Sequence, residues 1–195
     1  MIHRMAAAHD SCAVKRATSR FARRDVMSQA PSAAPIGKDL KALVARILDE
    51  NRDMAIATMR PDGWPQTTMV GFAHDDLTLF FVVARSSQKF LNLALDPRAS
   101  IAIGRYAAEA RAVRGLSMAV RVEEVVEPDE IRRLNALLWD RYPEIAVFAP
   151  RDTNCAVLRA KPQVISIVDD ALGLATPAIF AVVAQADLVP HRAAL

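Results

Sequence analysis

The sequence predicts a mainly β (α+β) domain, in which a small antiparallel barrel of about six strands carries two or three peripheral helices. The first observation is a series of short apolar runs, joined by polar turns too short for parallel crossovers. The second is a set of segments in which apolar residues recur at helical spacing. The third is composition, because 52% of the 195 residues are hydrophobic and only 6 are glycine, which favours a packed core.

The first half of the chain predicts one helix followed by three strands. The helix covers Asp39–Asn51, where apolar residues recur on a single face. The strands cover Met54–Met59, Trp64–Ala73 and Leu77–Ala84, and the first two are joined by the turn sequence Arg60–Gly63. Because the connections are short, the three strands are expected to form an antiparallel meander.

The second half predicts two more helices among the remaining strands. Ser86 or Ser87 suits the N-cap of a helix over Gln88–Leu95, and the Asp96-Pro97 pair ends it. A second helix begins at Pro128 and continues through Asp140. The strands expected here are Ala99–Arg105, Ala112–Val126, and a last strand or pair at Cys155–Arg159 and Gln163–Val168.

Composition divides the chain into a leader, a domain and a tail. Residues 1–35 are rich in Ala, Ser and Arg and are expected to form a disordered or mobile leader, with Met27 as an alternative start. Residues 36–170 form the predicted domain, and residues 171–195 a C-terminal tail. Residues 1–26 have a net charge of +4, so the remainder has a net charge of −1. A nearly neutral body argues against nucleic acid as a partner.

Cysteine and histidine usage excludes several classes of protein. The two cysteines, Cys12 and Cys155, are too few and too far apart for a disulfide framework or a cysteine-rich zinc site, which fits a reducing cytoplasm. The chain has no apolar stretch of the roughly 20 residues that a membrane helix needs, so we expect a soluble cytoplasmic protein. No metal site and no catalytic acid or base is predicted. The histidines are scattered: His3, His9, His74 and His191.

One segment is suited to binding a phosphate group. A strand ends in the polar turn Arg85–Ser87, and a helix starts immediately after it. The first N–H groups of a helix lack partners and attract anions. Lys89, one turn into the helix, could fold back as a point charge. An ordinary helix cap with a solvated lysine explains the same residues, so this segment alone leaves both interpretations open.

Residues 54–168 carry an ordered set of motifs that resembles the pyridoxamine 5′-phosphate oxidase-like, FMN-binding split barrels. Each motif is weak alone, and the resemblance depends on their order along about 115 residues. The motifs are Arg60-Pro61-Asp62-Gly63, Pro65-Gln66-Thr67-Thr68-Met69-Val70, Ser86-Ser87-Gln88-Lys89, Asn92-Leu93 and Asp96-Pro97-Arg98-Ala99.

The resemblance implies a six-stranded antiparallel split β-barrel that binds FMN. It implies that the flavin phosphate lies at the turn and first helical residues: Arg85, Ser86, Ser87, Gln88 and Lys89. It implies that the flavin ring lies along the second strand, at Thr67, Thr68, Met69 and Val70. It also implies a homodimer with the cofactor at the interface, for which Arg111–Arg114 and Trp139–Phe148 are candidate segments of the second subunit.

The sequence also departs from the vitamin B6 oxidases of that family. Phe72 stands where the flavin-lining strand of those oxidases is basic, Ala112 where they place a glutamine, and the tail has only His191-Arg192 in place of an Arg-rich motif. The expected function is therefore an FMN-dependent oxidoreductase that acts on an unidentified small molecule. Two alternatives stay open: an F420-dependent reductase of the same fold, and a non-catalytic module that binds flavin or haem.

Overall fold

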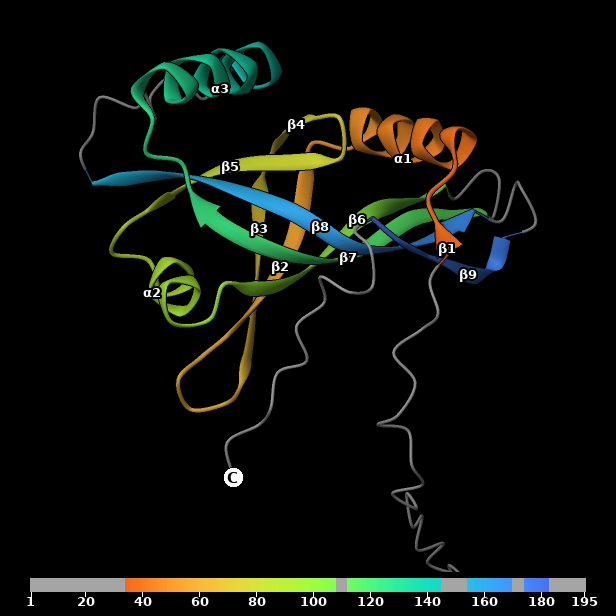
Figure 1. Ribbon diagram of the computed structural model, residues 1–195, viewed down its shortest axis with the longest axis horizontal. Coiled ribbons are helices and arrows are strands. Elements are labelled where there is room, and N and C mark those ends of the chain that lie inside the picture. Colours follow the sequence, from red (N-terminus) through yellow and green to blue (C-terminus); the bar gives the residue numbers. More distant parts are fainter. Residues whose placement is uncertain (1–33, 108–111, 145–153, 170–173, 183–195) are drawn as a thin grey trace, which may run out of the picture. The chain divides into compact units, whose positions relative to one another are not determined.

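The computed structural model describes residues 34–107, 112–144, 154–169 and 174–182, which form three helices and a sheet of nine strands (Figure 1). The helices are α1 (Lys38–Glu50), α2 (Gln88–Leu95) and α3 (Pro128–Arg141). The strands are β1 (Ala34–Pro35), β2 (Asp53–Met59), β3 (Pro65–Gly71), β4 (Ala73–Asp75), β5 (Thr78–Ala84), β6 (Arg98–Ala107), β7 (Ala112–Glu124), β8 (Cys155–Asp169) and β9 (Leu174–Ala181).

The sheet follows the order β1-β9-β8-β7-β6-β2-β3, and β5 pairs with β8 and β4. Strand β8 is long enough to pair with β7 along its length while β5 and then β9 occupy its other edge. Only the β1–β9 pair is parallel among the described ladders. The mainly β, antiparallel architecture with peripheral helices agrees with the predicted split barrel, but the strand count is higher than six.

The hydrophobic core lies inside the curved sheet and under α1. Strand β2 alternates between buried and partly exposed positions, as expected for a strand with one face on the core. Helix α1 buries the predicted apolar stripe, although Leu40 remains only partly buried. The largest fully buried side chains are Phe72, Phe81, Ile47, Leu48, Met54, Ile56, Leu79, Ile101, Met118, Leu134, Ile165 and Ile167.

The predicted three-stranded meander is wrong at its third strand. Strand β5 does not pair with β3; it pairs with β4 and with β8. The fully buried Phe72 separates β3 from β4, and β4 forms a hairpin with β5. Helix α3 packs on the other face of β5, in a second cluster formed by Phe80, Val125, Leu134 and Val157. A strand covered on both faces needs the continuous apolar sequence found in β5.

Two predicted boundaries also change. Cys155–Arg159 and Gln163–Val168 belong to one continuous strand, β8, rather than to a pair. Part of the predicted C-terminal tail is strand β9, which pairs with β8 and with β1. Strand β1 (Ala34–Pro35) pairs with β9, so the last residues of the predicted leader also join the sheet. Residues 1–33 lie outside the described residues, so the expected disorder of the leader stays a prediction.

Tyr142, just after α3, joins this helix to the end of β3. Its hydroxyl accepts a hydrogen bond from Phe72 N–H at 2.8 Å and lies within hydrogen-bond reach of the Arg52 and Phe72 carbonyls. Burial raises the pKa of the phenol, so it stays neutral and able to donate. Gly71 makes room for the ring, because a Cβ there would lie 3.0 Å from Tyr142 Cζ.

Replacing Tyr142 by phenylalanine is expected to lower the free energy of unfolding by about 1–3 kcal/mol, because buried backbone groups lose their hydroxyl partner while the ring packing is kept. Thermal or urea unfolding measures the change. Trp64→Phe is the matched control, since Trp64 is 72% exposed and its replacement should leave stability unchanged. Equal stability of the Tyr142→Phe variant and the parent would contradict this role.

Candidate functional site

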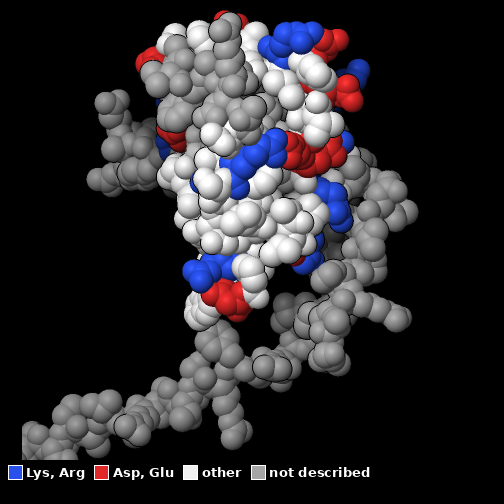
Figure 2. All heavy atoms as spheres, turned by 90° about the vertical axis from the view of Figure 1, so that its left-hand side faces the viewer, with Lys and Arg blue, Asp and Glu red and all other residues white. Residues whose placement is uncertain are grey.

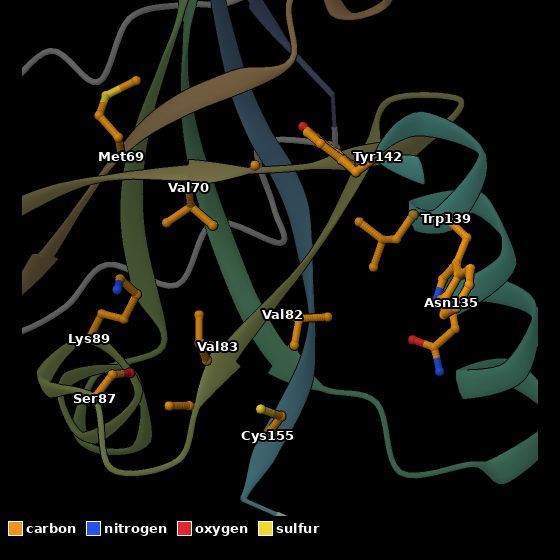
Figure 3. Close-up of a pocket in the computed structure, with 13 residues that line it drawn as sticks. Met69, Val70, Val82, Val83, Ser87, Lys89, Asn135, Trp139, Tyr142 and Cys155 are labelled. Carbon is orange, nitrogen blue, oxygen red and sulfur yellow. The ribbon is translucent and has the colours of Figure 1, made fainter. Parts of the chain in front are cut away.

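A cavity of about 490 Å³ opens where the barrel is split, between β3 and β5 (Figure 3). Among the described strands β3 pairs only with β2, so alternate backbone N–H and C=O groups on its other edge have no strand partner. The start of α2 lies at one side of the cavity and α3 at the other. The lining residues are Met69, Val70, Gly71, Val82, Val83, Ala84, Ser87, Lys89, Asn135, Leu138, Trp139, Tyr142 and Cys155.

The N-terminus of α2 forms a positively charged end of this cavity. Ser87 is the N-cap, and its Oγ accepts from the Phe90 N–H at 3.4 Å. No described group accepts a hydrogen bond from the backbone N–H of Gln88 or Lys89, as expected for the first residues of a helix. Within the described part of the chain, the Lys89 ammonium has no carboxylate partner. Unpaired N–H donors, a hydroxyl and a lysine are groups of the kind that bind an anion at a helix N-terminus.

Asn92 fixes α2 to the strands beside it. This side chain is fully buried, and its Nδ2 donates to Thr58 Oγ1 at 3.0 Å and to Gln66 Oε1 at 3.3 Å. Its Oδ1 accepts from Gln88 Nε2 at 2.9 Å. The first turn of α2 is thereby tied to β2 and β3. The sequence contained Asn92 as part of a motif, but its positioning role became visible only in the structure.

The structure brings four of the nine sequence-predicted cofactor residues to the cavity: Met69, Val70, Ser87 and Lys89. Arg85 does not line it. The Arg85 guanidinium pairs with Glu124 and lies 5.4 Å from the centre of the Phe90 ring. The hydrogen bond with Glu124 raises the pKa of Arg85.

The other four predicted residues lie beside the cavity and are not part of its lining. Thr67 and Ser86 are exposed, and Gln88 is bonded to Asn92. The Thr68 hydroxyl is buried, and no described group forms a hydrogen bond with it. Their predicted cofactor contacts stay predictions.

Sequence reasoning missed most of the opposite wall. Asn135, Leu138 and Trp139 of α3 face the cavity together with Tyr142. Their spacing of three, four and seven residues places them on one face of a helix, which was the available signal. Cys155 at the start of β8 also lines the cavity and is a free thiol.

Within the described ranges, no group of three or more His, Cys, Asp or Glu side chains could hold a metal ion. His74 lies 2.9 Å from Asp49 Oδ1 and 3.0 Å from the Asp76 carbonyl, and it does not line the cavity. None of the described helices is both long and apolar enough to cross a membrane.

A second hollow, of about 530 Å³, lies on the sheet surface over β2, β6, β7 and β8. Small residues of β6 and β7 form its floor, including the paired glycines Gly104 and Gly115. A Cβ at Gly104 would lie 2.7 Å from the Arg114 carbonyl oxygen, so any larger residue would disturb the β6–β7 pairing. Met69 lines both this hollow and the cavity.

The structure separates the two segments predicted to come from a second subunit. Arg114 lines the sheet hollow and donates to Asp169 at 2.8 Å, whereas Trp139 lines the cavity of its own chain. Residues 108–111 and 145–148 lie outside the described residues. The contribution of a second subunit stays a prediction.

The antiparallel sheet with its cavity between β3 and β5 places the chain in the class of split β-barrels. A family model described as pyridoxamine 5′-phosphate oxidase matches residues 40–169, and the chain belongs to this family. The resemblance inferred from the ordered motifs is therefore confirmed. No curated protein matches the chain by sequence.

Solved structures of the same fold include proteins that bind different groups. A haem-binding protein from Mycobacterium smegmatis has 23% identity and a TM-score of 0.63, over 75% of this chain and 60% of its own. The haem storage protein HutZ from Vibrio cholerae has 19% identity and a TM-score of 0.54, over 61% and 87%. An FAD-binding protein from Mesorhizobium loti has 16% identity and a TM-score of 0.52, over 63% and 88%. At these identities the likeness shows the fold alone.

Proposed function

We propose that the chain binds FMN in the cavity between β3 and β5 and acts as an FMN-dependent oxidoreductase on a small organic molecule. The observation that carries this proposal is that one cavity contains both Ser87 and Lys89, at the N-terminus of α2, and Met69 and Val70, on the free edge of β3. FMN has the same two parts, a phosphate and a flat ring with a polar edge. Membership of a family named for a flavin-type oxidase supports the choice of cofactor.

The residues of the cavity fit such a cofactor. Phosphate would be held by the Lys89 ammonium, the Ser87 hydroxyl and the first N–H groups of α2. Free backbone groups of β3 would bind the polar edge of the ring, while Val70, Val82 and Val83 would cover apolar surface and exclude water. When bound, the flavin supplies two-electron redox chemistry, and the protein's part is to position it.

We further propose that the protein is a homodimer in which the second copy occupies the sheet hollow. The floor of small residues lets another backbone approach closely. Since Met69 lines both the hollow and the cavity, a chain seated in the hollow would reach the cofactor. A two-fold axis would then create two equivalent sites.

Haem is the second candidate for the cavity, because Cys155 lies in its lining and a cysteine thiolate is one of the axial ligands of haem iron. Haem-binding proteins of this fold support the alternative. F420 shares the phosphate chemistry of FMN and is a third possibility at the same anion site. A non-catalytic module would bind any of these groups without turnover.

The visible spectrum of the purified protein, followed by mass spectrometry of what heat releases, tests the proposal. Flavin absorption with release of FMN would support it, a Soret band would assign the cavity to haem, and the mass of F420 would assign it to the deazaflavin. A protein that binds none of the three when they are added would overturn the proposed function.

Alkylation of Cys155 gives an independent test of where FMN lies. In a Cys12→Ser variant, Cys155 is the remaining thiol, and FMN is expected to slow its reaction with iodoacetamide at least about tenfold, because a bound ligand covers the cavity lining. Riboflavin, which lacks the phosphate, is the matched control ligand and should protect only at higher concentration. No protection by FMN would place the cofactor elsewhere, and equal protection by riboflavin would show that the phosphate adds nothing to binding in this cavity.

A further inference from the structure

The cavity is charged at one end only. Lys89 is the sole charged side chain among its described lining residues, and it lies on the α2 side. The α3 side presents the uncharged residues Asn135 and Trp139 (Figure 3), and Leu138 also belongs to the lining. A phosphate bound by α2 therefore leaves a neutral surface at the other end.

Helix α3 has three arginines, but each of them forms an ion pair or hydrogen bonds with groups outside the cavity. Arg132 pairs with Asp129, and Arg133 lies 2.8 Å from Asp75 Oδ2. Arg141 donates to the backbone carbonyls of Leu48 and Asn51. On the face that carries α2 and α3, basic atoms accordingly lie beside acidic atoms, with uncharged surface between them (Figure 2). None of these arginines lines the cavity.

The two side chains at the centre of this wall are available to a ligand. Trp139 is 45% exposed, and no described group accepts a hydrogen bond from its indole N–H. The Asn135 amide likewise has no hydrogen-bond partner among the described residues. By contrast, the Tyr142 hydroxyl is already bonded to the backbone groups of Phe72 and Arg52.

We propose that the α3 end of the cavity binds the substrate and selects an uncharged, planar aromatic compound. Such a ring would stack on Trp139, and a hydroxyl or carbonyl on it would bond to the Asn135 amide. A phosphate or carboxylate would find no cation among the described lining residues at this end and would lose its hydration without compensation. The inference rests on the proposed function, because it assumes that FMN occupies the α2 end.

Binding of 1-naphthol and of 1-naphthyl phosphate to the FMN-saturated protein tests this selectivity, because the two probes differ only by the phosphate. Equilibrium dialysis is expected to show at least about tenfold tighter binding of 1-naphthol. Trp139→Ala should weaken 1-naphthol about tenfold, whereas the matched control Trp64→Ala should leave it unchanged. FMN affinity, measured in the same samples, should be the same in both variants.

A gain-of-charge variant gives the sharper test. Asn135→Arg adds a cation to the wall and is expected to raise the affinity for 1-naphthyl phosphate roughly 10-fold or more, while that for 1-naphthol falls. Equal or tighter binding of the phosphate by the parent, or no effect of Trp139→Ala, would overturn the inference. If the protein fails to bind FMN, the proposed function fails, and the effect of Trp139→Ala on 1-naphthol binding to the cofactor-free protein still tests the α3 wall, because 1-naphthol has no phosphate for the α2 end.

Discussion

Replacing Lys89 by alanine is expected to weaken FMN binding roughly 10- to 150-fold, because a charge-assisted hydrogen bond to phosphate is worth about 1.5–3 kcal/mol. Lys89 lines the cavity at the N-terminus of α2 and has no carboxylate partner in the described part of the chain. Its ammonium therefore loses nothing within the protein when it binds an anion. For the same reason, the stability of the cofactor-free protein should change little.

Fluorescence titration with FMN measures the affinity, and thermal unfolding of the cofactor-free variant measures the stability. Arg85→Ala is the matched control, since Arg85 is only four positions away but pairs with Glu124. It should bind FMN about as well as the parent. If Arg85→Ala is the more damaging change, or if Lys89→Ala binds FMN normally, the anion site has been assigned to the wrong residues.

The contrast between these two residues shows which parts of the site the sequence could predict. Helix α2 has the predicted bounds, Gln88–Leu95, because its serine cap and the proline after it act locally. The position of Lys89 in the first turn of α2 follows from these local signals alone. Arg85 could not be placed in this way, since its partner Glu124 is 39 positions away and is brought near by the β5–β8–β7 pairing.

The same difference between local and long-range interactions separates the parts of the fold that the sequence could predict from the parts that it could not. The apolar stripe of α1 and the alternation in β2 are local patterns, and both elements form where expected. By contrast, β5 pairs with the distant strand β8, and its Phe80 lies in one buried cluster with Leu134 of α3; no short window of sequence contains these partners. For the same reason, Asn135 was missed and Trp139 was assigned to a second subunit, whereas both line the cavity of their own chain.

A charged side chain placed in the sheet hollow is expected to weaken dimerisation. Ser117 of β7 lies exposed in this hollow, so an arginine there should leave the single chain folded. In a packed interface between two copies, the same arginine is expected to cost at least about 2–3 kcal/mol, which weakens dimerisation roughly 30- to 150-fold. Val126→Arg is the matched control, because Val126 is 68% exposed and lies outside the hollow.

If FMN contacts both copies, it must bind the dimer more tightly than the monomer, and by linkage it must strengthen dimerisation by the same factor. Sedimentation of the parent at falling protein concentration, with and without FMN, measures this factor directly. The Ser117→Arg variant should then sediment as a monomer and bind FMN more weakly, although no residue of the cavity has been changed. Undiminished FMN affinity in a monomeric Ser117→Arg variant would show that one chain forms the whole site, and a dimeric variant would show that the second copy binds elsewhere on the surface.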